Sequence, residues 1–284
     1  MPKQKLLDYA KSIHIYMRRK TRALFTIAAG KGFPITKHDR QLSKLHNKYK
    51  GQRCFVLGNG PSLKRQNIGL LKDEFVFVTN SFFLHEEFAS LNHCFYCVSD
   101  PIFWGCRDSF DPKFLESISQ KKDIVYFINI NIQPIYQEQQ INFKTPVFFV
   151  RVNTSKKVWK GIFSTNVLFE TYWGCTVIID ICLPMAFYLG FDRIYLLGCD
   201  CDYRLNEAKD FSKSYFYDVS ELPKSMLEAM CKSRDRGGFE YSKEIPDSYQ
   251  IVKKYFEDHG RKIYNAGYGG KLDIFERVNY EDII

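Results

Sequence analysis

The chain has 284 residues, 45% of them apolar and 26% charged, which excludes a disordered or fibrous protein and is typical of a soluble globular one. Its formal net charge of +9 favours anionic partners, such as phosphorylated or carboxylated substrates or an anionic lipid surface. No DNA- or RNA-binding signature accompanies this charge, so nucleic acid is the partner least expected. Nine scattered cysteines show neither a disulfide framework nor zinc-ligand spacing, which favours a reducing cytoplasm.

Residues 1–50 are expected to form a basic helical arm followed by a linker. Residues 5–28 combine apolar side chains at helical spacing with a basic run around Arg18. Such a helix can lie on an anionic membrane surface, or pack on the protein with its charges in water. No run is apolar and long enough to span a bilayer, and no signal peptide is recognised. The expected location is therefore the cytoplasm, with peripheral contact at the inner membrane as the further possibility.

The main domain is expected over residues 51–284. It opens with a buried strand, 53–57, that ends in the tight turn Gly58-Asn59-Gly60-Pro61-Ser62. Glycines let a backbone approach a ligand closely, and the free N–H groups of a helix over 63–71 favour a phosphate. The turn lacks the third glycine of a dinucleotide fingerprint and the Gly-Lys-Ser/Thr of a P-loop, so neither class is supported. The alternative is a structural turn without a ligand.

Strands and helices alternate along the rest of the domain. An apolar run over 175–189 predicts a buried helix that ends at Gly190. Residues 130–144 show no regular period and are interpreted as a loop, and residues 204–245 as a helical lid-like or acceptor-binding insertion. This alternation predicts an α/β, Rossmann-like parallel sheet with helices on both faces. Further strands are expected over 75–78, 93–100, 124–129, 146–152, 193–197 and 262–265, with further helices over 112–120 and 246–258.

Polar residues follow several of these strands. Asn59 follows the first strand and Asn80 the second, while Asp100 and Asp200 end two later ones. Parallel strands bring their carboxyl ends to one edge of a sheet, where open α/β folds bind their ligands. The sequence therefore predicts one ligand crevice lined by these four side chains.

The residues around these strand ends carry a resemblance to known families. In order and spacing they are similar to bacterial sialyltransferases of glycosyltransferase family 42. They resemble even more closely domain-of-unknown-function family 115, which is found in surface-polysaccharide biosynthesis and is related to an archaeal 6-hydroxymethylpterin diphosphokinase. The resemblance covers roughly residues 51–284. The residues that carry it are 57–63, 79–83, 100–103, 189–200, 260–265 and 269–272.

The resemblance implies a glycosyltransferase of lipopolysaccharide or capsule biosynthesis. Its donor would be a CMP-activated sugar, sialic acid or a related keto-sugar acid, and its acceptor a glycan or lipid-linked glycan. Asp100 stands where the family has an amide, and an acid there repels a donor phosphate unless it faces the ribose hydroxyls. The alternatives are ATP-dependent pyrophosphate transfer to a pterin and a non-catalytic nucleotide-binding scaffold. The donor-binding residues implied are Gly58, Asn59, Gly60, Ser62, Asn80, Asp100 and Asp200.

The resemblance leaves the catalytic base open, because the family's histidine before the final helix has no counterpart in residues 239–246. A carboxylate whose pKa is raised by burial can serve instead. No cofactor is required if tyrosines neutralise the departing phosphate, as the family's paired tyrosines do. The Asp-x-Asp spacing of Asp200 and Asp202 resembles a metal signature, so a divalent metal is the alternative. The candidate bases are Glu240, Glu244, Asp210 and Asp202, and the candidate tyrosines are Tyr203, Tyr215 and Tyr217.

Overall fold

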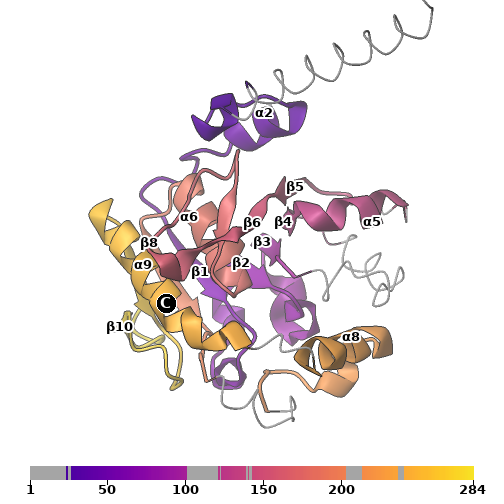
Figure 1. Cartoon of the computed structure of the whole chain (residues 1–284). Coiled ribbons are helices and arrows are strands. Elements are labelled where there is room, and N and C mark those ends of the chain that lie inside the picture. The colour runs from indigo at the N-terminus through magenta and orange to yellow at the C-terminus, as the bar shows by residue number, and fades with distance from the viewer. Residues whose placement is uncertain are drawn as a thin grey trace, which may run out of the picture.

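The computed structural model describes residues 24, 27–100, 121, 123–138, 140, 143–202, 213–235 and 240–284. Within these ranges, eight parallel strands form one sheet in the order β10-β9-β8-β1-β2-β3-β4-β5, so the expected Rossmann-like parallel sheet is confirmed (Figure 1). A second, two-stranded sheet pairs β6 (Val152–Lys157) with β7 (Thr171–Trp173). The strands of the large sheet are β1 (Arg53–Leu57), β2 (Phe75–Thr79), β3 (His93–Val98), β4 (Ile124–Asn129), β5 (Val147–Val150), β8 (Arg193–Leu197), β9 (Lys262–Asn265) and β10 (Glu276–Arg277).

The order of the strands reverses next to β1. From β1 the chain adds β2 to β5 on one side, and it then returns to place β8, β9 and β10 on the other. β1 therefore pairs with both β2 and β8 in parallel register. A reversal of this kind opens a crevice outside the carboxyl ends of the two strands that flank it, because their connections run in opposite directions. The fold thus predicts a ligand site where the chain leaves β1 and β8.

Both faces of the sheet are covered, as expected from its nearly continuous apolar strands. On β1, Cys54 and Val56 join one core cluster while Phe55 and Leu57 join the other. The first cluster is covered mainly by α-helices and the second by 3-10 turns and α8, which Figure 1 shows at the opposite end of the molecule from α2. The helices are α2 (Lys37–Ser43), α5 (Gln133–Glu138), α6 (Leu183–Leu189), α8 (Lys224–Asp235) and α9 (Ile245–Asp258).

The prediction of one continuous helix over residues 63–71 is wrong. The structure has two 3-10 turns, Pro61–Arg65 and Ile68–Leu71. Between them Gln66 takes an extended backbone, and its side-chain amide donates to the carbonyl of Ala266 at 2.8 Å. This buried tertiary contact interrupts the helix.

Three further segments differ from expectation. Residues 130–144 are not a loop, because a 3-10 turn, Ile130–Ile132, leads into α5. The run 146–152 is not one strand: it divides between β5 and β6, and the Arg151 carbonyl between them accepts the N–H of Thr171 in the small sheet. The run 175–189 opens with a π-helical turn, Ile178–Cys182, before α6. Gly190 ends α6 in the left-handed conformation as expected, with φ +97°.

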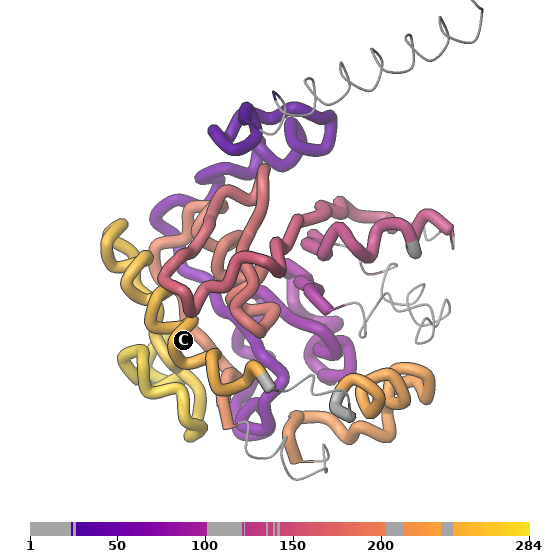
Figure 2. The backbone as a smooth tube through the Cα atoms, in the orientation of Figure 1, coloured from indigo at the N-terminus to yellow at the C-terminus, as the bar shows by residue number. Residues whose placement is uncertain are grey.

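Residues 37–50 pack on the same core as the following domain. Leu42 of α2 is 1% exposed, and the ring of Tyr49 lies 4.6 Å from that of Phe75 and 5.1 Å from that of Phe191. Figure 2 shows this indigo segment at one end of the molecule. The membrane-binding segment predicted over 5–28 lies almost wholly outside the described residues, as does the helix predicted over 112–120. Among the described helices, none is long and apolar enough to cross a membrane.

Candidate functional site

A cavity of about 800 Å³ opens at the carboxyl ends of the strands, over the crevice between β1 and β8. It brings together residues that follow separate strands: Asn59 after β1, Asn80 after β2, Asp100 after β3 and Asp200 after β8. Asn129, the last residue of β4, also lines it. The predicted site residues that line this cavity are Gly58, Asn59, Gly60, Ser62, Asn80, Asp100, Asp200, Asp202 and Tyr215.

The glycines of the turn after β1 also allow two turns of the chain to pack closely. A Cβ on Gly58 would lie 2.3 Å from the carbonyl oxygen of Gly198, and a Cβ on Gly60 would lie 2.3 Å from Oδ2 of Asp200. The N–H of Ser62 donates to that same Oδ2 at 2.9 Å. Both glycines and this N–H group therefore hold the turns after β1 and β8 together, and the N–H is taken by the protein rather than left for a phosphate.

Hydrogen bonds hold the side chain of Asn59 through its nitrogen, and its oxygen has no partner among the described residues. Its Nδ2 donates to the carbonyl and the hydroxyl oxygen of Thr79, at 3.0 Å each. Its Oδ1 is buried and has no hydrogen-bond partner among the described residues, and the same holds for Oγ of Ser62 and Oγ of Ser214. All three residues line the cavity. Because buried polar atoms are almost always hydrogen-bonded, this clustering indicates a place for polar groups of a ligand.

Backbone strain gathers around the same cavity. Asn80, Cys175 and Cys201 line it and have φ values of +47°, +72° and +51°. For residues other than glycine, this left-handed backbone conformation costs free energy, and residues that adopt it are typical of functional sites. The backbone carbonyl of Asn80 accepts a hydrogen bond from the hydroxyl of Tyr96 at 2.5 Å, and this bond holds the turn after β2 in place.

Among the predicted tyrosines, Tyr215 reaches the cavity. Its ring stacks on that of Tyr217 at 5.0 Å, and the N–H of Phe216 between them donates to the carbonyl of Asn59 at 3.0 Å. Burial raises the pKa of Tyr215 to about 12, with a further contribution from the charge of Asp100. Tyr215 therefore stays a neutral hydrogen-bond donor at physiological pH. Tyr217 is buried behind it, and Tyr203 lies outside the described residues.

The predicted carboxylates are spread over different environments. Asp202 forms an ion pair with Lys271 at 3.1 Å. Glu244 is half-buried at the N-cap of α9 and is not part of the cavity wall, while Glu240 begins the 3-10 turn before it. Asp210 lies outside the described residues. Within the described part of the chain, no group of three or more His, Cys, Asp or Glu side chains is arranged to hold a metal ion.

Asp180 is a cavity residue that the sequence analysis missed. It lies in the π-helical turn, is 2% exposed, and accepts the N–H of Gly174 at 2.7 Å and the hydroxyl of Ser99 at 2.8 Å. Burial raises the pKa of Asp180 to about 7, against the two hydrogen bonds; the charge of Asp100 adds to the rise and that of Lys157 opposes it. A single carboxylate inside an otherwise apolar buried run is the signal that points to it, because unpaired charges are seldom buried.

An aromatic cluster borders the cavity beside Asp180. Trp173 at the end of β7 and Tyr241 line the cavity, with ring centroids 4.9 Å apart, and Trp159 contacts both. The ammonium group of Lys157 lies 3.6 Å from the centroid of the Trp173 ring. Desolvation lowers the pKa of Lys157, and electrostatic interactions with Cys175 and Asp180 oppose that effect.

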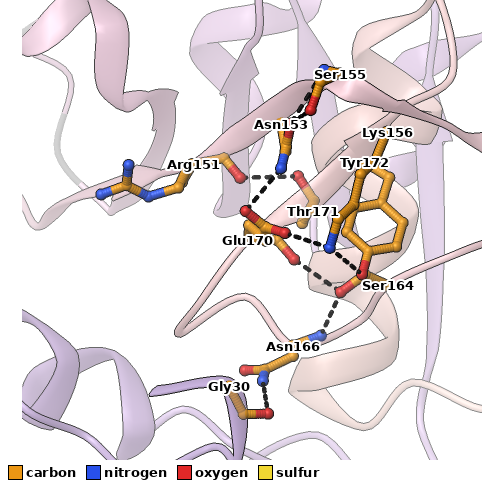
Figure 3. A network of polar contacts seen from close by, with 10 residues as sticks. All are labelled: Gly30, Arg151, Asn153, Ser155, Lys156, Ser164, Asn166, Glu170, Thr171 and Tyr172. Atoms are coloured by element: carbon orange, nitrogen blue, oxygen red, sulfur yellow. Dashed lines mark hydrogen bonds and ion pairs between the residues drawn. The ribbon is translucent and has the colours of Figure 1, made fainter. Parts of the chain in front are cut away.

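A polar network anchors the small sheet that carries Trp173 (Figure 3). At its centre the buried carboxylate of Glu170 pairs with Lys156 at 2.8 Å and accepts the side-chain amide of Asn153 at 2.9 Å. Asn166 in the neighbouring loop donates to the carbonyl of Gly30 at 3.0 Å. The network therefore ties both β6 and the N-terminal segment to the strand that ends at the cavity.

No known protein-family model and no curated protein matches the sequence, so the resemblance to domain-of-unknown-function family 115 stays a prediction. Among solved structures, the chain is similar to the sialyltransferase CstII from Campylobacter jejuni, whose structure was analysed in complex with a substrate analogue, cytidine-5′-monophosphate. The two are 18% identical over 81% of this chain and 85% of that one, with a TM-score of 0.45. At this level the likeness carries no information about the substrate of this chain.

Proposed function

We propose that this protein is a glycosyltransferase that moves a sugar from a cytidine nucleotide donor to a glycan acceptor in surface-polysaccharide biosynthesis. The observation that carries the proposal is the convergence of Asn59, Asn80, Asp100 and Asp200 on one cavity at the strand-order reversal. A volume of about 800 Å³ accommodates a nucleotide together with a sugar. The sugar proposed is sialic acid or a related keto-sugar acid.

The donor end of the cavity is the part near Asn59. The buried Oδ1 of Asn59 can accept a hydrogen bond from a base or a ribose, and the Ser62 hydroxyl can accept or donate one. Arg65 lines the same cavity, and its guanidinium group lies over the ring of Tyr268 at 5.4 Å. A guanidinium group binds phosphate and carboxylate oxygens in a planar, two-pronged way, so Arg65 fits an anionic donor.

Departure of the nucleotide needs stabilisation of its phosphate as negative charge develops. Tyr215 supplies a neutral hydroxyl in a half-buried setting, and Arg65 supplies a positive charge. Donors held in place before the reaction stabilise such charge strongly, because they need no reorganisation. In this proposal no metal ion is required, and transfer should persist in the presence of a chelator.

The proposal is tested first by melting curves of the purified chain with single nucleotides. Because a ligand that binds only the folded state stabilises it, cytidine monophosphate should raise the melting temperature without metal, and the other nucleoside monophosphates should raise it less. Incubation with CMP-sialic acid and a panel of glycans, followed by product mass, then identifies the acceptor. A shift with ATP and magnesium alone would instead favour pyrophosphate transfer, and donor binding without any product would favour a non-catalytic scaffold.

A membrane contact is proposed at the N-terminal end of the described chain. Leu24, Ile27 and Phe33 are 66%, 57% and 60% exposed, and in the sequence they follow the basic run Arg18-Arg19-Lys20. Exposed apolar side chains next to basic ones are suited to an anionic bilayer surface. Sedimentation with phosphatidylglycerol vesicles should carry the wild-type chain down, and the triple change L24S/I27S/F33S should leave more of it in solution. Equal sedimentation of both would contradict the contact.

A further inference from the structure

We propose that the acceptor sugar binds at the end of the cavity walled by Trp173 and Tyr241. There, Ser99 passes the proton of the attacking hydroxyl to Asp180. The inference rests on the proposed glycosyl transfer, and it names where the acceptor binds and which group takes its proton. None of these four residues is among the site residues that the sequence analysis identified.

The two rings form a surface suited to a sugar. Tyr241 is 44% exposed, and its ring meets that of Trp173 at 69°. The C–H bonds of a pyranose carry slight positive charge and pack on the negative face of an aromatic ring, while the sugar hydroxyls remain free to bond at the ring's edge. The ammonium group of Lys157 lies 3.6 Å from the centroid of the Trp173 ring, so a cation neighbours this part of the cavity wall.

The backbone between the rings and the carboxylate holds them in a fixed relation. Gly174 directly follows Trp173, and its N–H donates to Oδ1 of Asp180 at 2.7 Å. A Cβ on Gly174 would lie 2.2 Å from Cγ2 of Ile179, so no other residue permits this approach without a shift. A sugar held on the rings is therefore placed at a set distance from the π-helical turn.

Ser99 connects the cavity to Asp180. Its side chain is half-buried in the cavity wall, whereas Asp180 is nearly inaccessible behind it. The Ser99 hydroxyl donates to Oδ2 of Asp180 at 2.8 Å. The backbone carbonyl of Ser99 accepts a hydrogen bond from the side-chain amide of Asn129 at 2.9 Å, which fixes the position of Ser99. A serine oxygen that donates its proton in this way can accept one from a hydroxyl on its other side.

Transfer at this site makes one bond to the anomeric carbon and breaks another. The acceptor oxygen forms a bond to the anomeric carbon, while the bond from that carbon to the phosphate oxygen breaks and its electron pair leaves with the nucleotide. The acceptor's proton moves to Ser99, and the Ser99 proton moves to Asp180, which becomes a carboxylic acid and later releases the proton to water. A base whose pKa lies near the working pH is suited to this task, and the pKa of Asp180 is raised to about 7 by burial.

The titratable groups that interact with Asp180 come from several elements. Asp100 follows β3, Lys157 ends β6, Cys175 follows β7, and Cys182 shares the π-helical turn. Burial raises the pKa of Cys175 to about 12 and that of Cys182 well above its usual range, so neither thiol ionises near neutral pH. Asp100 and Lys157 are therefore the charges that set the ionisation of Asp180 together with its burial.

The test is steady-state transfer with the acceptor found by product mass, measured on four variants. Tyr241→Ala should raise the acceptor KM about tenfold and leave the donor KM unchanged, and Tyr241→Phe, which keeps the ring, should raise the acceptor KM much less than Tyr241→Ala does. Asp180→Asn and Ser99→Ala should each lower kcat about 100-fold with little change in either KM. The wild-type rate should fall below about pH 7 as Asp180 takes up a proton, and Asp180→Asn should lose this limb.

Melting shifts with cytidine monophosphate separate these outcomes from a failure to fold, because each variant should keep the wild-type shift. Should Asp180→Asn fail to fold, Ser99→Ala decides the proton route by itself. Unchanged kcat in Ser99→Ala, or an acidic limb that survives in a folded Asp180→Asn, would overturn the proton route. An unchanged acceptor KM in Tyr241→Ala would overturn the acceptor position. If the wild-type chain transfers no sugar at all, the proposed function fails and this inference fails with it.

Discussion

Oδ2 of Asp200 accepts the N–H of Ser62 at 2.9 Å, across 138 residues of chain. This bond joins the turn after β8 to the turn after β1, at the point where the strand order reverses. The N–H of Gly60 supports it by donating to the carbonyl of Gly198 at 2.8 Å. The floor of the cavity is therefore built by two turns that brace each other.

Asp200→Ala should lower the free energy of unfolding by about 1–3 kcal/mol, because it leaves the Ser62 N–H without its acceptor in a partly buried place. Asp200→Asn keeps an oxygen at that position and should lose less. Urea unfolding followed by circular dichroism measures both. Equal stability of the alanine variant and the wild type would show that the bond does not brace the turns.

Gly60→Ala should be more destabilising than a usual surface change, by about 1–3 kcal/mol, because its methyl group would meet Asp200 and the Gly198 backbone at 2.3 and 2.7 Å. Gly30→Ala is the matched control, since a Cβ there has no atom within 4 Å. Its unfolding free energy should stay within about 0.5 kcal/mol of the wild type. Similar losses in both variants would contradict the close approach of the two turns.

Asp180 should make the chain less stable as the pH rises. Its pKa is about 7 when folded and 3.8 as the ordinary value, so the folded chain binds more protons between these values. The free energy of unfolding should therefore fall through this window, by at most about 1.4 kcal/mol per pH unit from this group, and the fall should end above about pH 7. Urea unfolding over this range should show a smaller fall for Asp180→Asn. Identical slopes would show that Asp180 titrates normally.

Much of the sheet was predictable from the sequence. Strands such as 53–57, 124–129 and 193–197 are short apolar runs bounded by turn residues, and they agree with β1, β4 and β8 because a parallel sheet buries both faces of each strand. The placing of Asn59 and Asp200 at one cavity was predictable for the same reason, since parallel strands end at one edge.

Other features depend on contacts that a local pattern does not reveal. The break at Gln66 results from a hydrogen bond to Ala266, 200 residues away. The glycines at 58 and 60 pack against Gly198, a contact between turns far apart in the chain that the local sequence does not reveal. Asp180 faces the cavity from a π-helical turn, whose irregular period hides it within an apolar run.

Asn59→Ala should remain folded but lose about 1–2 kcal/mol of unfolding free energy, because the carbonyl and hydroxyl oxygens of Thr79 lose the amide that donates to them. Melting curves without ligand measure this loss. A variant as stable as the wild type would show that these two hydrogen bonds add nothing to the fold. Leu70→Ala, which changes a side chain that is 50% exposed outside the cavity wall, serves as the control.

We propose that the ends of separate parallel strands bind a cytidine nucleotide, and calorimetric titration with cytidine monophosphate in a chelating buffer tests this most directly. The wild-type chain and Leu70→Ala should bind one nucleotide with equal affinity. Asn59→Ala should bind at least about tenfold more weakly, a loss of about 1.4 kcal/mol. Absence of binding to the wild type, or equal binding to all three chains, would contradict the claim.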